Sequence, residues 1–242
     1  METEIAIAAI TLVGAMVQTV AGFGFSLLVV PTLVIFMEPA QAVPISAVLS
    51  FMNALRVSHS VREHAPWRLV FLLLAGSVIG LPLGVYVLLY TSAEVLRVLV
   101  GVTAATMAGA IWFGLRWKHS DVAAGLTGFV SGILTTSTAI NGPPIVLYLQ
   151  ASGLPPTVFR AALSNLFVLN GVFALTGFVW AGVLGVAELR QIAIGIPFLL
   201  GGYWLGQKLL GRLDPERFQK FVLMLLAVAG AATATVALLR LL

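Results

Sequence analysis

Long apolar segments occupy nearly all of this chain, and the charged residues lie near the ends of those segments. Only 9% of the 242 residues are charged and 60% are hydrophobic, whereas a soluble domain carries about 25% charged residues. Roughly 20 apolar residues suffice for a helix to cross the hydrocarbon core of a bilayer. The alternating pattern of an outer-membrane barrel is absent, and a lipid-exposed backbone must satisfy its own hydrogen bonds. The sequence therefore predicts an all-α integral membrane protein.

Two of the eight apolar segments, 5–37 and 121–151, are too long for one straight crossing. At about 1.5 Å per residue, each would extend roughly 45–50 Å. Polar and glycine-rich stretches interrupt both, at Ala21-Gly22-Phe23-Gly24-Phe25-Ser26 and at Thr138-Ala139-Ile140-Asn141-Gly142-Pro143-Pro144. We therefore predict that each segment is a broken helical hairpin. The other six segments predict transmembrane helices at 40–58, 67–90, 93–116, 157–181, 187–210 and 215–241.

The positions of Lys and Arg indicate how segment 121–151 folds. If all eight segments cross the membrane, the basic residues divide seven against six. If 121–151 enters and returns on the same side, they divide ten against three, the asymmetry expected of a cytoplasmic face. We therefore predict a re-entrant hairpin, and basic loops 56–68, 116–118 and 208–220 in the cytoplasm. Segment 5–37 has no nearby Lys or Arg, so its re-entrant assignment rests on analogy with 121–151.

A weak internal repeat relates the two halves of the chain. Pro39 pairs with Pro156 and Asn53 with Asn170 at an offset of 117. One hairpin plus three crossings is an odd number, so a second copy would be inverted relative to the first. The sequence thus predicts two inverted repeats, 1–118 and 119–242. Glycine pairs at a second offset of 122 suit helix packing within one chain or between the chains of a homodimer: Gly80 with Gly84, and Gly202 with Gly206.

Each break opens a new helix whose N-terminal amides we expect to face the protein centre. Asn141 is positioned to cap the second of these helices, with Pro143 in its first turn, and Gly24 or Ser26 takes a similar part in the first. Two such positive helix ends facing each other form an anion site. Glycines allow close approach of a ligand. The predicted substrate-binding residues are Gly22, Gly24, Phe25, Ser26, Thr136, Ser137, Thr138, Asn141, Gly142 and Pro143.

Other polar residues in the apolar segments have two interpretations each. Gln18, Asn53, Asn165 and Asn170 are expected to surround the site, although interhelical hydrogen bonding explains them equally well. The Ser and Thr hydroxyls can instead bond to carbonyls of their own helix. Arg56 and Arg160, near helix ends, could attract an anion or simply extend toward the membrane surface.

Several function classes lack the residues that they need. No acidic residue lies deep in a predicted crossing, which disfavours cation transport and a carboxylate proton relay. A coupling proton or cation is nevertheless left open. The absence of cysteine excludes disulfides and thiolate metal sites, and we expect no metal and no cofactor. No hydrolase motif or P-loop suggests an enzyme or an ATP-driven pump. The basic residues follow membrane topology, so we expect lipid and not nucleic acid as a partner.

The two breaks resemble those of the sulfite exporter TauE/SafE family. The resemblance rests on the stretch from Ala21 to Ser26 with Pro31 after it, on the stretch from Thr138 to Pro144, and on their separation of about 120 residues. It implies transport of small sulfur-containing anions, such as sulfite or sulfoacetate, across a bacterial inner membrane. Together with the facing helix ends, it predicts a secondary transporter that works by alternating access. A passive anion channel of the same fold and a non-transporting membrane scaffold are the alternatives.

Overall fold

The computed structural model describes residues 2–113 and 120–210, which are helical apart from short loops. The predicted loop 116–118, most of the loop 208–220 and the predicted helix 215–241 lie outside the described residues. The helices are α1 (Glu2–Ala21), α2 (Phe25–Phe36), α3 (Pro39–Val61), α4 (Trp67–Tyr90), α5 (Ala93–Trp112), α6 (Asp121–Ser137), α7 (Gly142–Ala151), α8 (Pro156–Trp180) and α9 (Val186–Leu209). A 3₁₀ turn, Arg62–His64, follows α3.

Four helices of the described chain are long and apolar enough to cross a membrane, which confirms the prediction of a multi-pass α-helical protein. They span Thr3–Ala21, Pro39–His64, Trp67–Tyr90 and Pro156–Trp180. Exposed aromatic side chains lie at the ends of two of these helices. They are Trp67 and Tyr90 at the two ends of α4, and Trp180 at the end of α8. Amphipathic aromatic rings are typical of the membrane–water interface.

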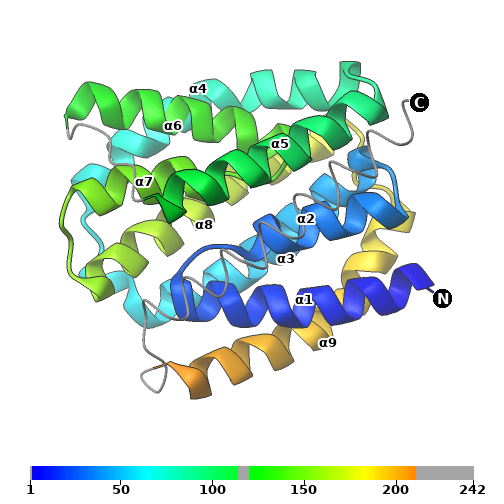
Figure 1. Ribbon diagram of the computed structural model, residues 1–242, viewed down its shortest axis with the longest axis horizontal. Helices are drawn as coiled ribbons and strands as arrows, with labels where there is room; N and C mark the ends of the chain where they lie inside the picture. Colours follow the sequence, from blue (N-terminus) through cyan, green and yellow to red (C-terminus); the bar gives the residue numbers. More distant parts are fainter. Residues whose placement is uncertain (1, 114–119, 211–242) are drawn as a thin grey trace.

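Both predicted breaks are present. The helix α1 ends at Ala21 and α2 begins at Phe25, while α6 ends at Ser137 and α7 begins at Gly142. The second arms, α2 with 12 residues and α7 with 10, are too short to cross a bilayer alone, at roughly 18 and 15 Å. In Figure 1 the pair α1–α2 has its open end on the right and α6–α7 has its open end on the left. The two hairpins therefore enter the molecule from opposite ends.

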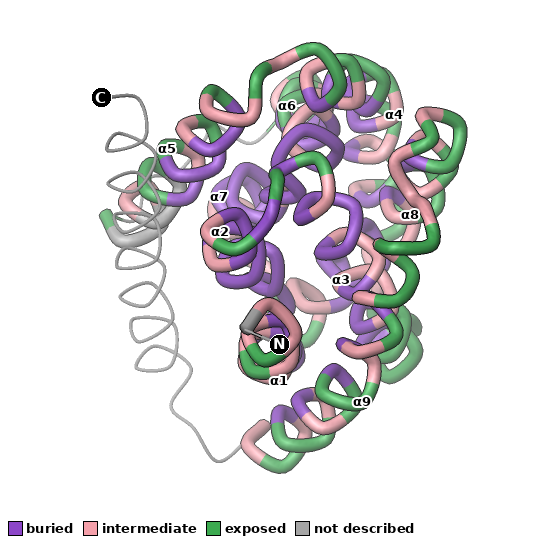
Figure 2. The backbone as a smooth tube through the Cα atoms, turned by 90° about the vertical axis from the view of Figure 1, so that its right-hand side faces the viewer, coloured by how far each residue is buried: buried purple, intermediate pink, exposed green. Residues whose placement is uncertain are grey.

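The short second arms lie at the centre of the helix packing. Figure 2 shows buried positions gathered on α2, α7 and α3, while exposed positions line the outer faces of α4, α5, α8 and α9. Every residue from Pro143 to Leu149 of α7 is buried, as is every residue from Phe25 to Pro31 of α2. The breaks are therefore enclosed by protein, as membrane helices with unpaired backbone groups require.

Glycines bring α4 and α6 into backbone contact along their length. A Cβ atom at Gly80 would overlap the carbonyl oxygen of Phe129, and one at Gly84 would overlap that of Ile133. From the other side, a Cβ at Gly132 would overlap the carbonyl of Ser77. Small residues let membrane helices approach this closely and so increase their van der Waals contact.

The same device joins α9 to α1. A Cβ atom at Gly202 would overlap the carbonyl of Leu12, and one at Gly206 would lie 2.9 Å from that of Met16. Both glycine pairs, at positions 80 and 84 and at 202 and 206, therefore pack within this chain. Each joins a long helix of one half to the first arm of the hairpin in the other half (Figure 1).

The α4–α6 contact gives a direct stability test. Gly80→Ala should lower the free energy of unfolding by about 1–3 kcal/mol, because the new methyl group must push two backbones apart. Gly125→Ala on α6 is the matched control, since its Cβ would meet no atom within 4 Å. Thermal unfolding in detergent measures both. Equal unfolding midpoints for the two variants would contradict this account of the helix contact.

Candidate functional site

The two breaks touch each other at the centre of the protein. A Cβ atom built on Gly142 of the second break would lie 3.5 Å from Cβ of Phe23 in the first. It would also lie 3.5 Å from the ring of Phe167, on α8. The second break is therefore in van der Waals reach of both the first break and α8, and Gly142 leaves room for this contact.

Two small adjoining cavities lie against the breaks, with volumes of about 20 and 10 Å³, which is room for roughly one water molecule each. Five residues line both, and they come from α2, α3, the second break and α8: Ser26, Ser50, Ala139, Asn141 and Phe167. Of the predicted binding residues, the cavities bring together Gly24, Phe25, Ser26, Asn141 and Gly142, and they add Gln18 from the predicted surroundings. Gly22, Thr136, Ser137, Thr138 and Pro143 lie outside the lining.

The first break contributes residues with unbonded backbone amides to the lining of the smaller cavity. Gly22 and Gly24 have φ values of 84° and 100°, in the left-handed region that glycine adopts without steric cost. Gly24 precedes α2, and the first backbone bond of that helix runs from the amide of Leu28 to the carbonyl of Gly24, at 3.3 Å. The amides of the intervening residues, Phe25 to Leu27, have no helical acceptor. All three residues line the smaller cavity.

The second break begins differently, and the prediction that Asn141 caps α7 is wrong. Asn141 precedes α7 but makes no side-chain capping bond, and its backbone lies in the right-handed helical region with φ −92°. A capping side chain bonds to the second or third amide of the helix. In α7 those positions are Pro143 and Pro144, which have no N–H. The placement of Pro143 in the first turn is confirmed.

Without a capping bond, the side chain of Asn141 is available to a ligand. It lines both cavities. None of the hydrogen bonds among the described residues involves its carboxamide, and only its backbone carbonyl is engaged, by the hydroxyl of Ser131 at 2.9 Å. The two prolines leave Gly142 as the remaining amide donor in the first turn of α7. The second break thus offers one backbone donor and one carboxamide.

The hydroxyl cluster before the second break bonds to backbone carbonyls. Thr136 donates to the carbonyl of Leu81 on α4 at 2.7 Å. Ser137 and Thr138 donate to carbonyls four residues earlier in α6, at 2.7 and 3.1 Å. Thr135 also donates within α6, but it lines the larger cavity. Of the two interpretations, bonding to the backbone describes these side chains in this structure.

Amide side chains fix the first break to α3. Asn53 donates to the side-chain oxygen of Gln18 at 2.9 Å, and Gln18 donates to the Ser50 hydroxyl at 3.4 Å. The hydroxyl of Ser46 donates to that of Ser26 at 3.2 Å. This chain of contacts crosses from α1 and α2 to α3 beside the smaller cavity.

The other two predicted amides lie on α8 and line neither of these two cavities. Asn165 accepts a hydrogen bond from Ser58 of α3 at 2.9 Å and donates to the carbonyl of Ala161. Asn170 is fully buried, and neither atom of its amide has a partner among the described residues. Asn165 therefore serves the contact between α8 and α3.

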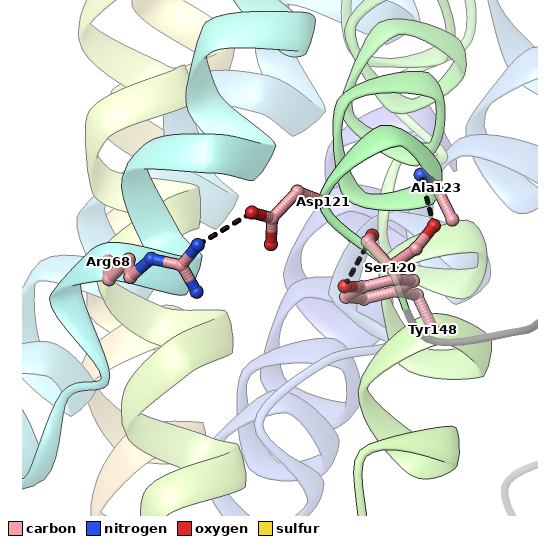
Figure 3. A network of polar contacts seen from close by, with 5 residues as sticks. All are labelled: Arg68, Ser120, Asp121, Ala123 and Tyr148. Carbon is pink, nitrogen blue, oxygen red and sulfur yellow. Dashed lines mark hydrogen bonds and ion pairs between the residues drawn. The ribbon is translucent and has the colours of Figure 1, made fainter.

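The open end of the second hairpin is held by the polar contacts drawn in Figure 3. The hydroxyl of Ser120 accepts from the amide of Ala123 and caps α6, and the Tyr148 hydroxyl of α7 donates to the Ser120 carbonyl at 3.1 Å. Arg68, at the start of α4, pairs with Asp121 at 2.6 Å. These contacts tie α6 to both α7 and α4, and so position the second break from its outer end.

Sequence reasoning missed Ala139, which has the strained backbone of the second break. Its φ of 55° is the only positive value for a non-glycine residue in the described chain. Ala139 lines both cavities. The internal offset of 117 was the available signal, since it pairs Ala139 with Gly22, whose φ is also positive. Among the described residues, no cluster of His, Cys, Asp or Glu could hold a metal ion.

Comparison with known proteins places the chain in a family. The sequence profile described as "Sulfite exporter TauE/SafE" matches residues 6–233. The chain belongs to the sulfite exporter TauE/SafE family. It is similar to the "Probable sulfite/organosulfonate exporter TauE" of Cupriavidus necator, with 24% identity over 233 residues that cover 90% of this chain and 89% of that protein. No solved structure matches it. The family consists of membrane transporters and not of enzymes.

The strained backbone of Ala139 can be tested by replacing two alanines with glycine, one at a time, because we expect opposite changes in the free energy of unfolding. Ala139→Gly should raise the free energy of unfolding by up to about 1 kcal/mol, because glycine removes the steric cost of a left-handed backbone. Ala174→Gly is the control, since Ala174 lines the same cavity from within α8 and should become less stable by about 0.5–1 kcal/mol. Thermal unfolding in detergent compares them. A loss of stability in both variants would contradict the inference that the backbone of Ala139 is strained.

Proposed function

We propose that this protein is a secondary transporter that moves sulfite or a small organosulfonate across the bacterial inner membrane by alternating access. The observation that carries the proposal is the meeting of two broken helices at cavities lined by hydrogen-bond donors. A sulfite or sulfonate head group has three oxygens that accept hydrogen bonds and a negative charge that suits a helix N-terminus.

The proposed site divides the donors between the two breaks. The backbone amides of α2, at residues 25–27, bind the sulfonate oxygens, and the carboxamide of Asn141 and the amide of Gly142 contact the substrate from the other side. No acidic side chain lines either cavity in the described structure, so the charge of an anion meets no repulsion there. Phe25 and Phe167 supply the apolar walls that exclude water.

The proposal includes two inverted repeats, residues 1–118 and 119–242, each a hairpin followed by three transmembrane helices. The spacing of helix starts supports it, since α2 and α7 begin at Phe25 and Gly142, and α3 and α8 at Pro39 and Pro156, with an offset of 117 in both cases. The opposite directions of the hairpins and the reciprocal glycine contacts of α4–α6 and α9–α1 support it as well.

Alternating access then takes a specific form. Because glycine packing joins α1 to α9 and α6 to α4, we expect each of these pairs to move as a unit across the repeat boundary. The contact between α3 and α8, beside the cavities, is the surface on which the units rearrange. Cytoplasmic placement of loops 56–68, 116–118 and 208–220 follows from their basic residues and belongs to the same proposal. A coupling proton or cation, and a homodimer, are compatible with it.

Exchange across liposomes tests this function. Purified protein in liposomes should take up radiolabelled sulfite or sulfoacetate. Anion inside the liposomes should stimulate that uptake, because a carrier that has released its substrate inside can bind internal anion and return with it to the outer side. Asn141→Leu should reduce uptake by about tenfold or more, since it removes a donor worth on the order of 1.5–3 kcal/mol toward a charged ligand.

The matched control is Gln150→Leu, the same loss of an amide at the far end of α7. It should transport as the unchanged protein does. Flux without stimulation by internal anion would indicate a channel of the same fold. No flux and no binding of either anion by a folded protein would favour a scaffold and overturn the proposal.

A further inference from the structure

Arg160 of α8 lies against the back of the first break. Its Nη2 donates to the carbonyl of Thr19 in the last turn of α1, at 2.8 Å. A Cβ atom at Gly22 would lie 3.3 Å from Cγ of Arg160 and 3.5 Å from its Cα. The absence of a side chain at Gly22 thus makes room for Arg160. Gly24, two residues later in the chain, lines the smaller cavity.

The guanidinium of Arg160 has no carboxylate partner among the described residues. Arg97, which is buried, pairs with Glu38 at 3.1 Å and also donates to the carbonyl of Val34. Arg160 is half-buried, and its Nε is enclosed without a hydrogen-bond partner. A partly buried positive charge that is balanced only by the carbonyl end of α1 is costly unless an anion comes near it.

A purely structural role accounts for only part of this arrangement. A cation at the end of α1 interacts favourably with the helix dipole, and the bond to the Thr19 carbonyl serves that purpose. This role uses one nitrogen of the guanidinium and leaves Nε unpaired.

We propose that Arg160 determines the charge specificity of the site, because its guanidinium is the positive charge that favours an anion at the first break. This inference rests on the proposed function. The α2 amides supply hydrogen bonds but only a partial charge, whereas Arg160 supplies a full one. A substrate with two negative charges should therefore depend on Arg160 more than a substrate with one.

Transport of two sulfonates by purified variants in liposomes tests the inference. Arg160→Gln should raise KM for sulfoacetate, a dianion, by about tenfold or more, and KM for methanesulfonate, a monoanion, by a clearly smaller factor. Arg160→Lys should restore most of the preference for the dianion. Arg62→Gln is the matched control, because it removes an exposed charge in the 3₁₀ turn after α3. It should leave both KM values unchanged.

The outcomes separate the inference from the function on which it rests. Equal changes for both anions, or a lower maximal rate with unchanged KM, would reduce Arg160 to a helix cap and leave the transporter intact. No transport of either anion by the unchanged protein would overturn the proposed function and this inference with it.

If Arg160→Gln fails to fold, Arg160→His provides the comparison within one folded protein. Its preference for sulfoacetate over methanesulfonate should increase as the pH falls through about 6.5, where histidine gains its charge. The unchanged protein, whose three histidines are His59, His64 and His119, should show no such dependence. A flat preference in the histidine variant would overturn the inference.

Discussion

An interrupted helix leaves amides that no helical carbonyl can accept, and this constraint organises the rest of the structure. In a membrane protein such groups are tolerated only where protein or a polar cavity surrounds them. The two second arms, α2 and α7, are accordingly the most enclosed helices, and longer helices surround them (Figure 2). The breaks lie where the two arms begin, and residues of both breaks line the shared cavities.

Holding two hairpins in place requires contacts that do not depend on the hydrophobic effect, because lipid is as apolar as the helices themselves. Backbone contact through glycine meets this requirement at α4–α6 and α1–α9. Side-chain hydrogen bonds and an ion pair then hold the hairpins in position. Ser120, Tyr148 and Arg68 secure the outer end of the second hairpin, while Gln18 and Asn53 secure the first break against α3. The positions of the breaks therefore follow from packing at a distance as well as from local sequence.

The sequence predicted the breaks well because glycine and proline interrupt helices by local chemistry. It predicted the site less completely, because which side chains line a cavity depends on the rotation of neighbouring helices. Ser50 and Phe167, on α3 and α8, could not be chosen from their own surroundings. The hydroxyls of Thr136, Ser137 and Thr138 looked like ligand donors, but carbonyls of their own helix or of α4 accept their hydrogen bonds. The capping error at Asn141 was avoidable, since two prolines stand where the capping bond would be made.

The absence of a capping bond at Asn141 makes the two breaks chemically different. If both helices offered the same set of amides, the two breaks would bind an anion in equivalent ways. Instead, α2 retains its amides from Phe25 to Leu27. In α7 two prolines remove two amide donors, and the Asn141 carboxamide makes no capping bond. Proline fixes its own φ, so the first turn of α7 is held without a capping bond. The two halves of the proposed site are therefore chemically unequal, and this inequality suits a substrate whose charged head differs from the rest of the molecule.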